Sequence, residues 1–388
     1  MSPGARSCAR ICGFLSRGGL PGSQLCSGPG SFFCHRTAIL TSRRASISTN
    51  SIEGNRGAIL IQAASVVANR RLCREHYCIT LRVNDLPDAE PGQFVHISPE
   101  NDGCTSYRTC ASDARTTHNQ WTTNCYAPLL RRAFSIAGLS RAPDGVSIDV
   151  IYRVVGTATH WLESLKTGDG LSVLGPLGNR FPVSEYKPLA WLVAGGVGLP
   201  PMLWLAEALH HAGKRTVALC GAQTADLLAL TVEPGVPPAA DATCATLCCR
   251  EFAKSEAAAV ISTDDGSLGF QGHIGAAMAA YHDADPVTSE ELVVYTCGPE
   301  PMMRFVAEYC IERDIECQVC MERTMACGTG LCQSCVVPIR DNDDPDGWSY
   351  RLCCTYGPIF DAASIIWEPA DVRQPDAGRV GTTHRTGD

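Results

Sequence analysis

The sequence predicts a multi-domain β plus α/β protein, in which an antiparallel β-barrel is followed by an α/β domain with a parallel sheet and by a small C-terminal lobe. Three observations predict it. The 388 residues exceed the usual size of one domain. After Tyr186 the pattern changes from short β-type runs to alternating strand and helix. Three cysteines then gather within residues 325–335.

Composition excludes several classes of protein. A formal charge of -8, with acids and bases interspersed, leaves no basic face for nucleic acid. The most apolar stretch, residues 189–213, carries Gly and Pro in mid-run, which a membrane-spanning helix does not favour. The 22 cysteines stand in a chain large enough to be held by ordinary cores, so we expect a reducing compartment, buried thiols and no membrane.

We predict five segments along the chain. These are a disordered N-terminal extension (1–55), the β-barrel (56–183), the α/β domain (184–313), the C-terminal lobe (314–367) and a tail (368–388). The extension is rich in Ser, Gly, Arg and Cys and has no acidic residue before Glu53. It is therefore either an extension without function or a targeting peptide.

Short β-type runs separated by turn residues indicate the barrel. They read GAILIQAASVVANRRL, YCITLRV, GQFVHISP, RRAFSIAG, VSIDVIYRVV and LSVLGPLG. The α/β domain follows as LAWLVAGG, MLWLAEALHHAG, KRTVALCGA, AAAVIST, GAAMAAYH, ELVVYTCG and EPMMRFVAEYCIERD. Two polar or Pro-rich stretches, 100–128 and 231–256, are predicted loop insertions.

A nucleotide site is expected where the first strand of the α/β domain meets its helix. Gly195, Gly196 and Gly198 allow close approach of the backbone, and unpaired amides at a helix N-terminus attract phosphate. The glycines alone are also compatible with a tight turn that binds no ligand. A second turn, TCGPEPM at 296–302, ends another strand at the same sheet edge, where such sheets bind ligands.

The cysteine cluster carries the most specific spacing. Cys327, Cys332 and Cys335 form Cys-x4-Cys-x2-Cys, the plant-type pattern of a [2Fe-2S] centre. A structural zinc site is the alternative, with Cys317 and Cys320 as a second Cys-x2-Cys pair upstream. The fourth ligand of the iron centre is Cys353 or Cys354, and spacing alone leaves both open.

Seven motifs in order carry a family resemblance: RRAFSIAG, YRVVGTATHWL, LGPLGNRF, LVAGGVGLPPM, TDDGSLGFQG, YTCGPEPMM and MACGTGLCQSC. Over residues 57–365 the chain resembles the ferredoxin reductase superfamily, and most closely the electron-transfer subunit of class 1B dihydroorotate dehydrogenase. The resemblance implies FAD in a flavin-binding β-barrel, NAD(H) in the α/β domain and a [2Fe-2S] cluster in the C-terminal lobe.

The resemblance also implies site residues. For the flavin they are Arg132, Phe134, Ser135, Tyr152, Arg153, Gly156 and Thr159. For the nicotinamide nucleotide they are Gly195, Gly196, Gly198, Cys297, Gly298 and Pro299. For the cluster they are Cys327, Cys332, Cys335 and, from the register of CTYGP, Cys354.

Three positions leave questions. Ala158 stands where the family has Gly, which puts the neighbouring flavin contact in doubt. Asp264 and Asp265 match a family motif, and a role as turn caps is the alternative. No catalytic residue is assigned, although Cys297 is a candidate beside the nicotinamide, with packing as its other role.

The function implied is electron transfer, by [2Fe-2S] and FAD, between NAD and a separate FMN-containing dihydroorotate dehydrogenase subunit in a heterotetramer. No basic residue directly follows the second strand, in CGAQTADLL, and this favours NADH over NADPH. Two alternatives remain: a reductase subunit serving a ferredoxin, hydrogenase, sulfur-reducing or oxygenase component, and a zinc-binding interaction module. A cytoplasmic location is expected, or a mitochondrial one if residues 1–54 act as a transit peptide.

Overall fold

The computed structural model describes residues 59–99 and 130–367, all within a unit that begins at Asn55. The predictions for the N-terminal extension, for the insertion at 100–128 and for the tail lie outside these residues. Among the described residues, no helix is long and apolar enough to cross a membrane.

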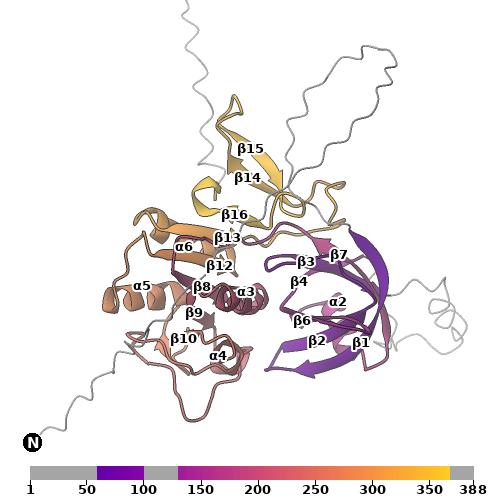
Figure 1. Cartoon of the computed structure of the whole chain (residues 1–388), viewed down its shortest axis with the longest axis horizontal. Coiled ribbons are helices and arrows are strands. Elements are labelled where there is room, and N and C mark those ends of the chain that lie inside the picture. Colours follow the sequence, from indigo (N-terminus) through magenta and orange to yellow (C-terminus); the bar gives the residue numbers. More distant parts are fainter. Residues whose placement is uncertain (1–58, 100–129, 368–388) are drawn as a thin grey trace, which may run out of the picture. The chain divides into compact units, whose positions relative to one another are not determined.

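The first part of the described chain is a curled seven-stranded antiparallel sheet with the order β4-β3-β7-β1-β2-β6-β5 (Figure 1). Side chains on β2 and β6 alternate between buried and partly exposed positions, as expected where one sheet face packs on a core. The strands are β1 (Leu60–Arg71), β2 (His76–Val83), β3 (Phe94–Pro99), β4 (Arg132–Ser135), β5 (Gly138–Ala142), β6 (Gly145–Arg153) and β7 (Gly170–Leu177).

Two elements of this sheet region were not predicted. Strand β5 is too polar to give an apolar alternation, and it pairs at the sheet edge with β6. The short helix α2 (Thr157–Ser164) begins after Gly156 and buries only Leu162. The Thr159 hydroxyl accepts from the N–H groups of Val155 and Gly156, at 2.9 and 3.0 Å, which fixes the start of this helix.

The second sheet has the order β11-β10-β9-β8-β12-β13-β16 and is parallel except at β16. Every residue of the central strand β8 is buried, as expected of a parallel sheet covered on both faces. The elements are β8 (Leu189–Gly195), α3 (Leu199–His211), β9 (Arg215–Ala222), β10 (Ala258–Thr263), β11 (Phe270–Gln271), α5 (Ile274–Ala284), β12 (Leu292–Cys297), α6 (Glu300–Ile311), β13 (Glu316–Cys320) and β16 (Ile359–Asp361).

The predicted insertion at 231–256 covers the edge of this sheet beside β10. Thr246 and Ala259 exchange two backbone hydrogen bonds, of 3.0 and 2.7 Å, in an antiparallel bridge. A short helix, α4 (Arg250–Ala253), completes the segment and buries Phe252. The insertion therefore shields backbone groups that an open edge would leave unpaired.

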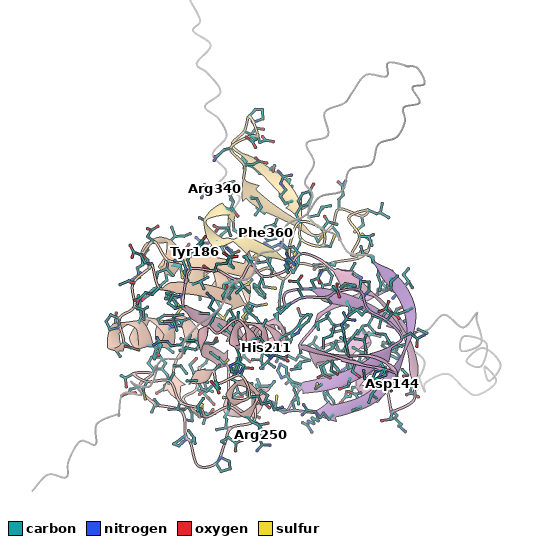
Figure 2. The ribbon with its side chains drawn as sticks, viewed as in Figure 1. Asp144, Tyr186, His211, Arg250, Arg340 and Phe360 are labelled. Atoms are coloured by element: carbon teal, nitrogen blue, oxygen red, sulfur yellow. The ribbon has the colours of Figure 1, made fainter. Side chains whose placement is uncertain are left out.

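The C-terminal lobe contains the hairpin β14 (Val336–Arg340) and β15 (Trp348–Leu352). Phe360 of β16, labelled in Figure 2, is buried in the same core as Cys353 and Cys354. Strands β13 and β16 fall within the segment 314–367 but pair in the second sheet. The lobe is thus built into the α/β sheet, and the predicted domain boundaries remain a proposal.

Candidate functional site

Two glycine-containing turns touch each other at the carboxyl edge of the parallel sheet. One joins β8 to α3 through Gly196–Gly198, and the other joins β12 to α6. A Cβ atom on Gly198 would lie 2.0 Å from the carbonyl oxygen of Cys297, and one on Gly298 would lie 2.8 Å from that of Gly195. Only glycine permits this backbone contact, which places both helix N-termini at one edge.

A cavity of about 530 Å³, here named the sheet-edge pocket, opens beside these turns. The parallel sheet contributes Gly195, Gly196, the end of β9 and Asp264, while the antiparallel sheet contributes His76 and Arg153. The segment after β9 adds Gln223 and Leu227. The remaining lining comes from α5, α6 and their preceding turns: His273, Ile274, Gly275, Pro299, Pro301, Met302 and Phe305. This is the edge at which open α/β sheets bind their ligands.

The two acids of the predicted TDDGS motif have different positions. The Asp265 carboxylate accepts from the backbone N–H and the hydroxyl of Ser267, at 3.0 and 2.6 Å, and so caps the turn. The backbone N–H of Asp264 donates to the carbonyl oxygen of Ala222 across 3.1 Å. Asp264 also lines the sheet-edge pocket. Asp265 therefore caps the turn, as the alternative interpretation expected, whereas Asp264 lines the pocket.

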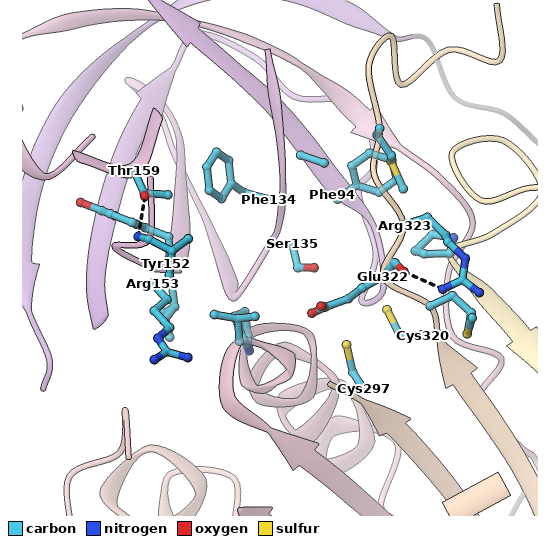
Figure 3. A pocket seen from close by; sticks show the side chains of 18 residues that line it. Phe94, Phe134, Ser135, Tyr152, Arg153, Thr159, Cys297, Cys320, Glu322 and Arg323 are labelled. Atoms are coloured by element: carbon cyan, nitrogen blue, oxygen red, sulfur yellow. Dashed lines mark hydrogen bonds between the residues drawn. The ribbon is translucent and has the colours of Figure 1, made fainter. Parts of the chain in front are cut away.

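A second cavity of about 450 Å³, here named the barrel pocket, lies between the two sheets (Figure 3). Its walls are mainly apolar. They are Phe94, Ala133, Phe134, Ser135, Ile151, Tyr152, Arg153, Val155, Thr159, Val197, Pro200, Cys297, Cys320, Met321, Glu322, Arg323, Met325 and Pro358. The pocket thus collects five of the seven residues assigned to the flavin, together with Cys297 from the nucleotide turn.

Arg132 and Gly156 are the two assigned flavin residues outside this lining. The exposed Arg132 guanidinium donates to the carbonyl groups of Leu130 and Arg131, at 3.1 and 3.2 Å. Gly156 caps α2, and a Cβ atom there would meet nothing within 4 Å. Both assignments stay predictions.

Arg153 borders both pockets and is held by one carboxylate. Its Nε and Nη2 atoms each lie 2.7 Å from Oε2 of Glu75. The hydrogen bond from Arg153 lowers the pKa of Glu75, so the pair remains charged at neutral pH. The planar guanidinium is thereby oriented between the two pockets.

Sequence reasoning missed the wall that follows β13. Cys320 stands beside Cys297 in the sheet register, and contact between the two thiols, together with burial, raises the pKa of Cys297 well above its ordinary value. Glu322 and Arg323 come directly afterwards and also line the barrel pocket. Their position directly after the carboxyl end of a parallel strand could have indicated a place in the site, but strand β13 was not predicted from the sequence.

The four predicted cluster cysteines form two pairs. Cys327 and Cys332 interact directly through their thiols, and so do Cys335 and Cys354. The N–H groups of Thr329 and Cys332 each donate to the Cys327 sulfur across 3.4 Å. Burial acts to raise the pKa of Cys327, but these donors outweigh it and lower the pKa to about 6. Cys327 is thus prepared to serve as a thiolate.

The loop between these cysteines depends on two glycines in the left-handed region. Gly328 has φ +72° and Gly330 has φ +87°. A Cβ atom on Gly328 would also lie 2.8 Å from the ring of His96, which is fully buried on β3. The loop is therefore seated directly on the antiparallel sheet.

The other cysteines of the region are engaged elsewhere. Cys353 donates to the carbonyl oxygen of Met321 across 3.4 Å. Cys317 interacts with Cys310, and Cys320 with Cys297, in cores on opposite sides of the sheet. Cys317 and Cys320 therefore do not complete a zinc site with the loop. Within the described ranges no three metal-binding side chains converge on one ion, whereas two thiol pairs suit a two-iron centre.

Two family models match the chain. Residues 322–366 match the iron-sulfur cluster binding domain of dihydroorotate dehydrogenase B, and residues 192–308 match an oxidoreductase NAD-binding domain. One solved structure, reported for an NADH-dependent reduced ferredoxin-NADP oxidoreductase, aligns with a TM-score of 0.58 and 24% identity over 78% of this chain and 89% of that chain. At this identity it shows the fold.

Curated relatives are more similar in sequence. The electron transfer subunit of dihydroorotate dehydrogenase B (NAD(+)) from Desulforamulus reducens is 31% identical, over 73% of this chain and 91% of its own. The subunit of the same name from Bacillus caldolyticus is 32% identical, over 77% of this chain and 96% of its own. The chain therefore belongs to the family of dihydroorotate dehydrogenase B electron transfer subunits.

Proposed function

We propose that this chain carries electrons between NAD(H) and a separate dihydroorotate-oxidising subunit, in pyrimidine biosynthesis. The observation that carries the proposal is the continuity of three sites. Cys297 joins the nucleotide turns to the barrel pocket, and Met321 joins the barrel pocket to the cysteine loop through Cys353. Electrons moving between the outermost sites would therefore pass by the barrel pocket.

The barrel pocket fits an FAD ring system. Its volume of about 450 Å³ lies in the range of cofactor sites, and its apolar walls carry few polar groups. Phe134, Ser135, Tyr152 and Thr159 would hold the flavin, with Arg153 kept in position by Glu75. When bound, a flavin converts between hydride and single electrons, which nicotinamide and iron-sulfur chemistry require.

The sheet-edge pocket fits NAD(H). Gly195 and Gly196 leave the backbone open at the N-terminus of α3, where a diphosphate is favoured. Asp264 adds a carboxylate with no cation beside it in the described hydrogen bonds and ion pairs, which favours a ribose hydroxyl over a 2'-phosphate. Cys297 would then lie between the nicotinamide and the flavin as part of the wall.

The cysteine loop fits a [2Fe-2S] cluster, with Cys327 and Cys332 on one side and Cys335 and Cys354 on the other. Leu331, within this loop, is 85% exposed. An exposed apolar side chain beside an electron-transfer site is suited to contact a protein partner. We propose that the partner is an FMN-containing catalytic subunit, that two copies of each chain form a heterotetramer, and that the complex is cytoplasmic.

Copurification with the catalytic chain tests this function. The complex is prepared anaerobically, dihydroorotate is added, and bleaching of flavin absorbance and formation of NADH are followed. We expect both signals from the complex and neither from the isolated electron-transfer chain. Bleaching by NADH but not by dihydroorotate in the complex would overturn the proposed partner.

A further inference from the structure

His96 lies on β3, directly against the cysteine loop, and its ring has no hydrogen-bond partner. The residue is fully buried, and among the described residues neither Nδ1 nor Nε2 bonds to another group. A Cβ atom on Gly328 would lie 2.8 Å from both Nε2 and Cε1 of the ring. The Nε2 edge of the imidazole is therefore turned toward the backbone that follows Cys327.

The surroundings of this ring give no packing reason for an imidazole. The ring of Phe94 lies 5.8 Å away between centroids, and the Cδ1 atom of Leu177 lies 3.0 Å from the same Cβ position on Gly328. Buried polar groups almost always have a partner, and an unpaired one destabilises the fold. A leucine or phenylalanine would fill this space without that cost. The ring therefore points to a partner that the described polypeptide does not provide.

The ring is neutral and has one N–H group to donate. Burial, together with the charges of Arg131 and Arg132, lowers the pKa of His96 to about 4. The Arg131 guanidinium contacts the backbone of His96, where it donates to the carbonyl oxygen across 3.4 Å. A neutral imidazole carries its proton on one nitrogen. With the proton on Nε2, the N–H group is directed at the cysteine loop.

Sulfur is the acceptor that a cluster would bring to this loop. Backbone N–H groups already donate to two of the predicted ligands. Those of Thr329 and Cys332 donate to Cys327, and that of Cys354 donates to Cys335. The thiolates and inorganic sulfides of a [2Fe-2S] cluster become more negative when the cluster gains an electron. Hydrogen bonds to these sulfurs stabilise the reduced form and so raise the reduction potential.

We propose that His96 is a positioning residue of the cluster site: its Nε2–H group donates a hydrogen bond to a sulfur of the cluster and thereby raises the reduction potential. This inference rests on the proposed function, because it assumes a [2Fe-2S] cluster in the cysteine loop. The same strand, β3, contributes Phe94 to the barrel pocket. One strand of the antiparallel sheet would therefore contact both redox sites.

The midpoint potential of the cluster tests this role in the complete, cofactor-loaded protein. It is measured by an anaerobic redox titration that follows the paramagnetic signal of the reduced cluster. His96→Leu removes the donor and should lower the potential by about 59 mV, a tenfold change in the one-electron equilibrium, as expected for loss of one hydrogen bond to a charged group. His160→Leu, at an exposed position of α2, is the matched control and should keep the wild-type potential.

A variant that retains a donor separates the hydrogen bond from packing. The amide Nε2 atom of glutamine reaches about as far from the backbone as the imidazole Nε2 atom, so His96→Gln should restore most of the lost potential. Iron and labile sulfide are measured in each variant, so that every potential refers to an intact cluster. A role in packing alone would lower the potential equally in His96→Leu and His96→Gln.

A spectroscopic signature tests the contact in the wild-type protein. With isotope-labelled histidine, pulsed paramagnetic resonance of the reduced cluster should show magnetic coupling to one histidine nitrogen and to an exchangeable proton. The nitrogen coupling should disappear in His96→Leu and persist in His160→Leu. The wild-type signal serves as the test if His96→Leu does not fold.

The outcomes distinguish this inference from the function beneath it. If the wild-type protein contains neither iron nor labile sulfide, the proposed function fails. If the cluster is present and dihydroorotate bleaches the flavin of the complex, the function stands. Equal potentials of His96→Leu and wild type, equal losses in His96→Leu and His96→Gln, or no histidine coupling in the wild type would then overturn the assignment of His96.

Discussion

The sulfur of Cys335 accepts a hydrogen bond from the backbone N–H of Cys354 across 3.4 Å. The two thiols also interact with each other, and burial, together with this contact, raises the pKa of Cys354 to about 12. The neighbouring Cys353 points instead to the carbonyl oxygen of Met321. The structure thus separates two adjacent cysteines that the spacing could not distinguish.

Replacing these neighbours should give opposite results. Cys354→Ala should abolish the iron, labile sulfide and visible absorbance of the cluster, because a [2Fe-2S] centre requires four ligands. Cys353→Ala should retain all three, and it serves as the control for folding of the lobe. Cluster loss in Cys353→Ala with retention in Cys354→Ala would reverse the assignment.

Asp264 should determine the choice of nicotinamide cofactor. A 2'-phosphate beside this carboxylate would be repelled, so Asp264→Ser should raise the preference for NADPH relative to NADH by roughly tenfold, or ~1.4 kcal/mol. The ratio of kcat/KM values for flavin reduction measures it. Asp265→Ser, which removes only the turn cap, should leave the ratio unchanged. Equal ratios in both variants and the wild type would contradict this role.

Gly198 should tolerate no larger residue. Because a Cβ atom there would lie 2.0 Å from the Cys297 carbonyl oxygen, Gly198→Ala should force the two turns apart and destabilise the protein by about 1–3 kcal/mol. Chemical denaturation would measure this loss. Gly235→Ala is the control, since a Cβ atom at that position meets nothing within 4 Å. Equal stabilities of the two variants would show that the turns separate easily.

Leu331 should contribute to the affinity for the catalytic subunit. Leu331→Ser removes an exposed apolar side chain from the cysteine loop, and we expect the Kd to rise by about tenfold or more with the cluster spectrum intact. Leu247→Ser removes an exposed leucine from the insertion at 231–256 and should leave the Kd unchanged. Equal affinity of Leu331→Ser and wild type would place the interface elsewhere.

Sequence patterns predicted the elements whose burial repeats regularly. The buried run of β8 and the alternation along β6 are examples, and local glycine and cysteine spacing located the turns and the cysteine loop. The parallel strand β13 was not identified, because its cysteines and glutamine give no clear apolar period. Glu322 was missed for the same reason, since its position in the barrel pocket depends on segments distant in sequence.

The strand β16 has a consequence for how the protein can be divided. Because β16 pairs with β13, a chain that stops before the hairpin would leave unpaired backbone groups along the edge of β13 that faces away from β12. Such a fragment would tend to self-associate through that strand. A fragment that keeps only the two pockets therefore cannot be obtained from this chain by simple C-terminal truncation. Assembly of the cluster in the C-terminal lobe and stability of the parallel sheet should instead depend on each other.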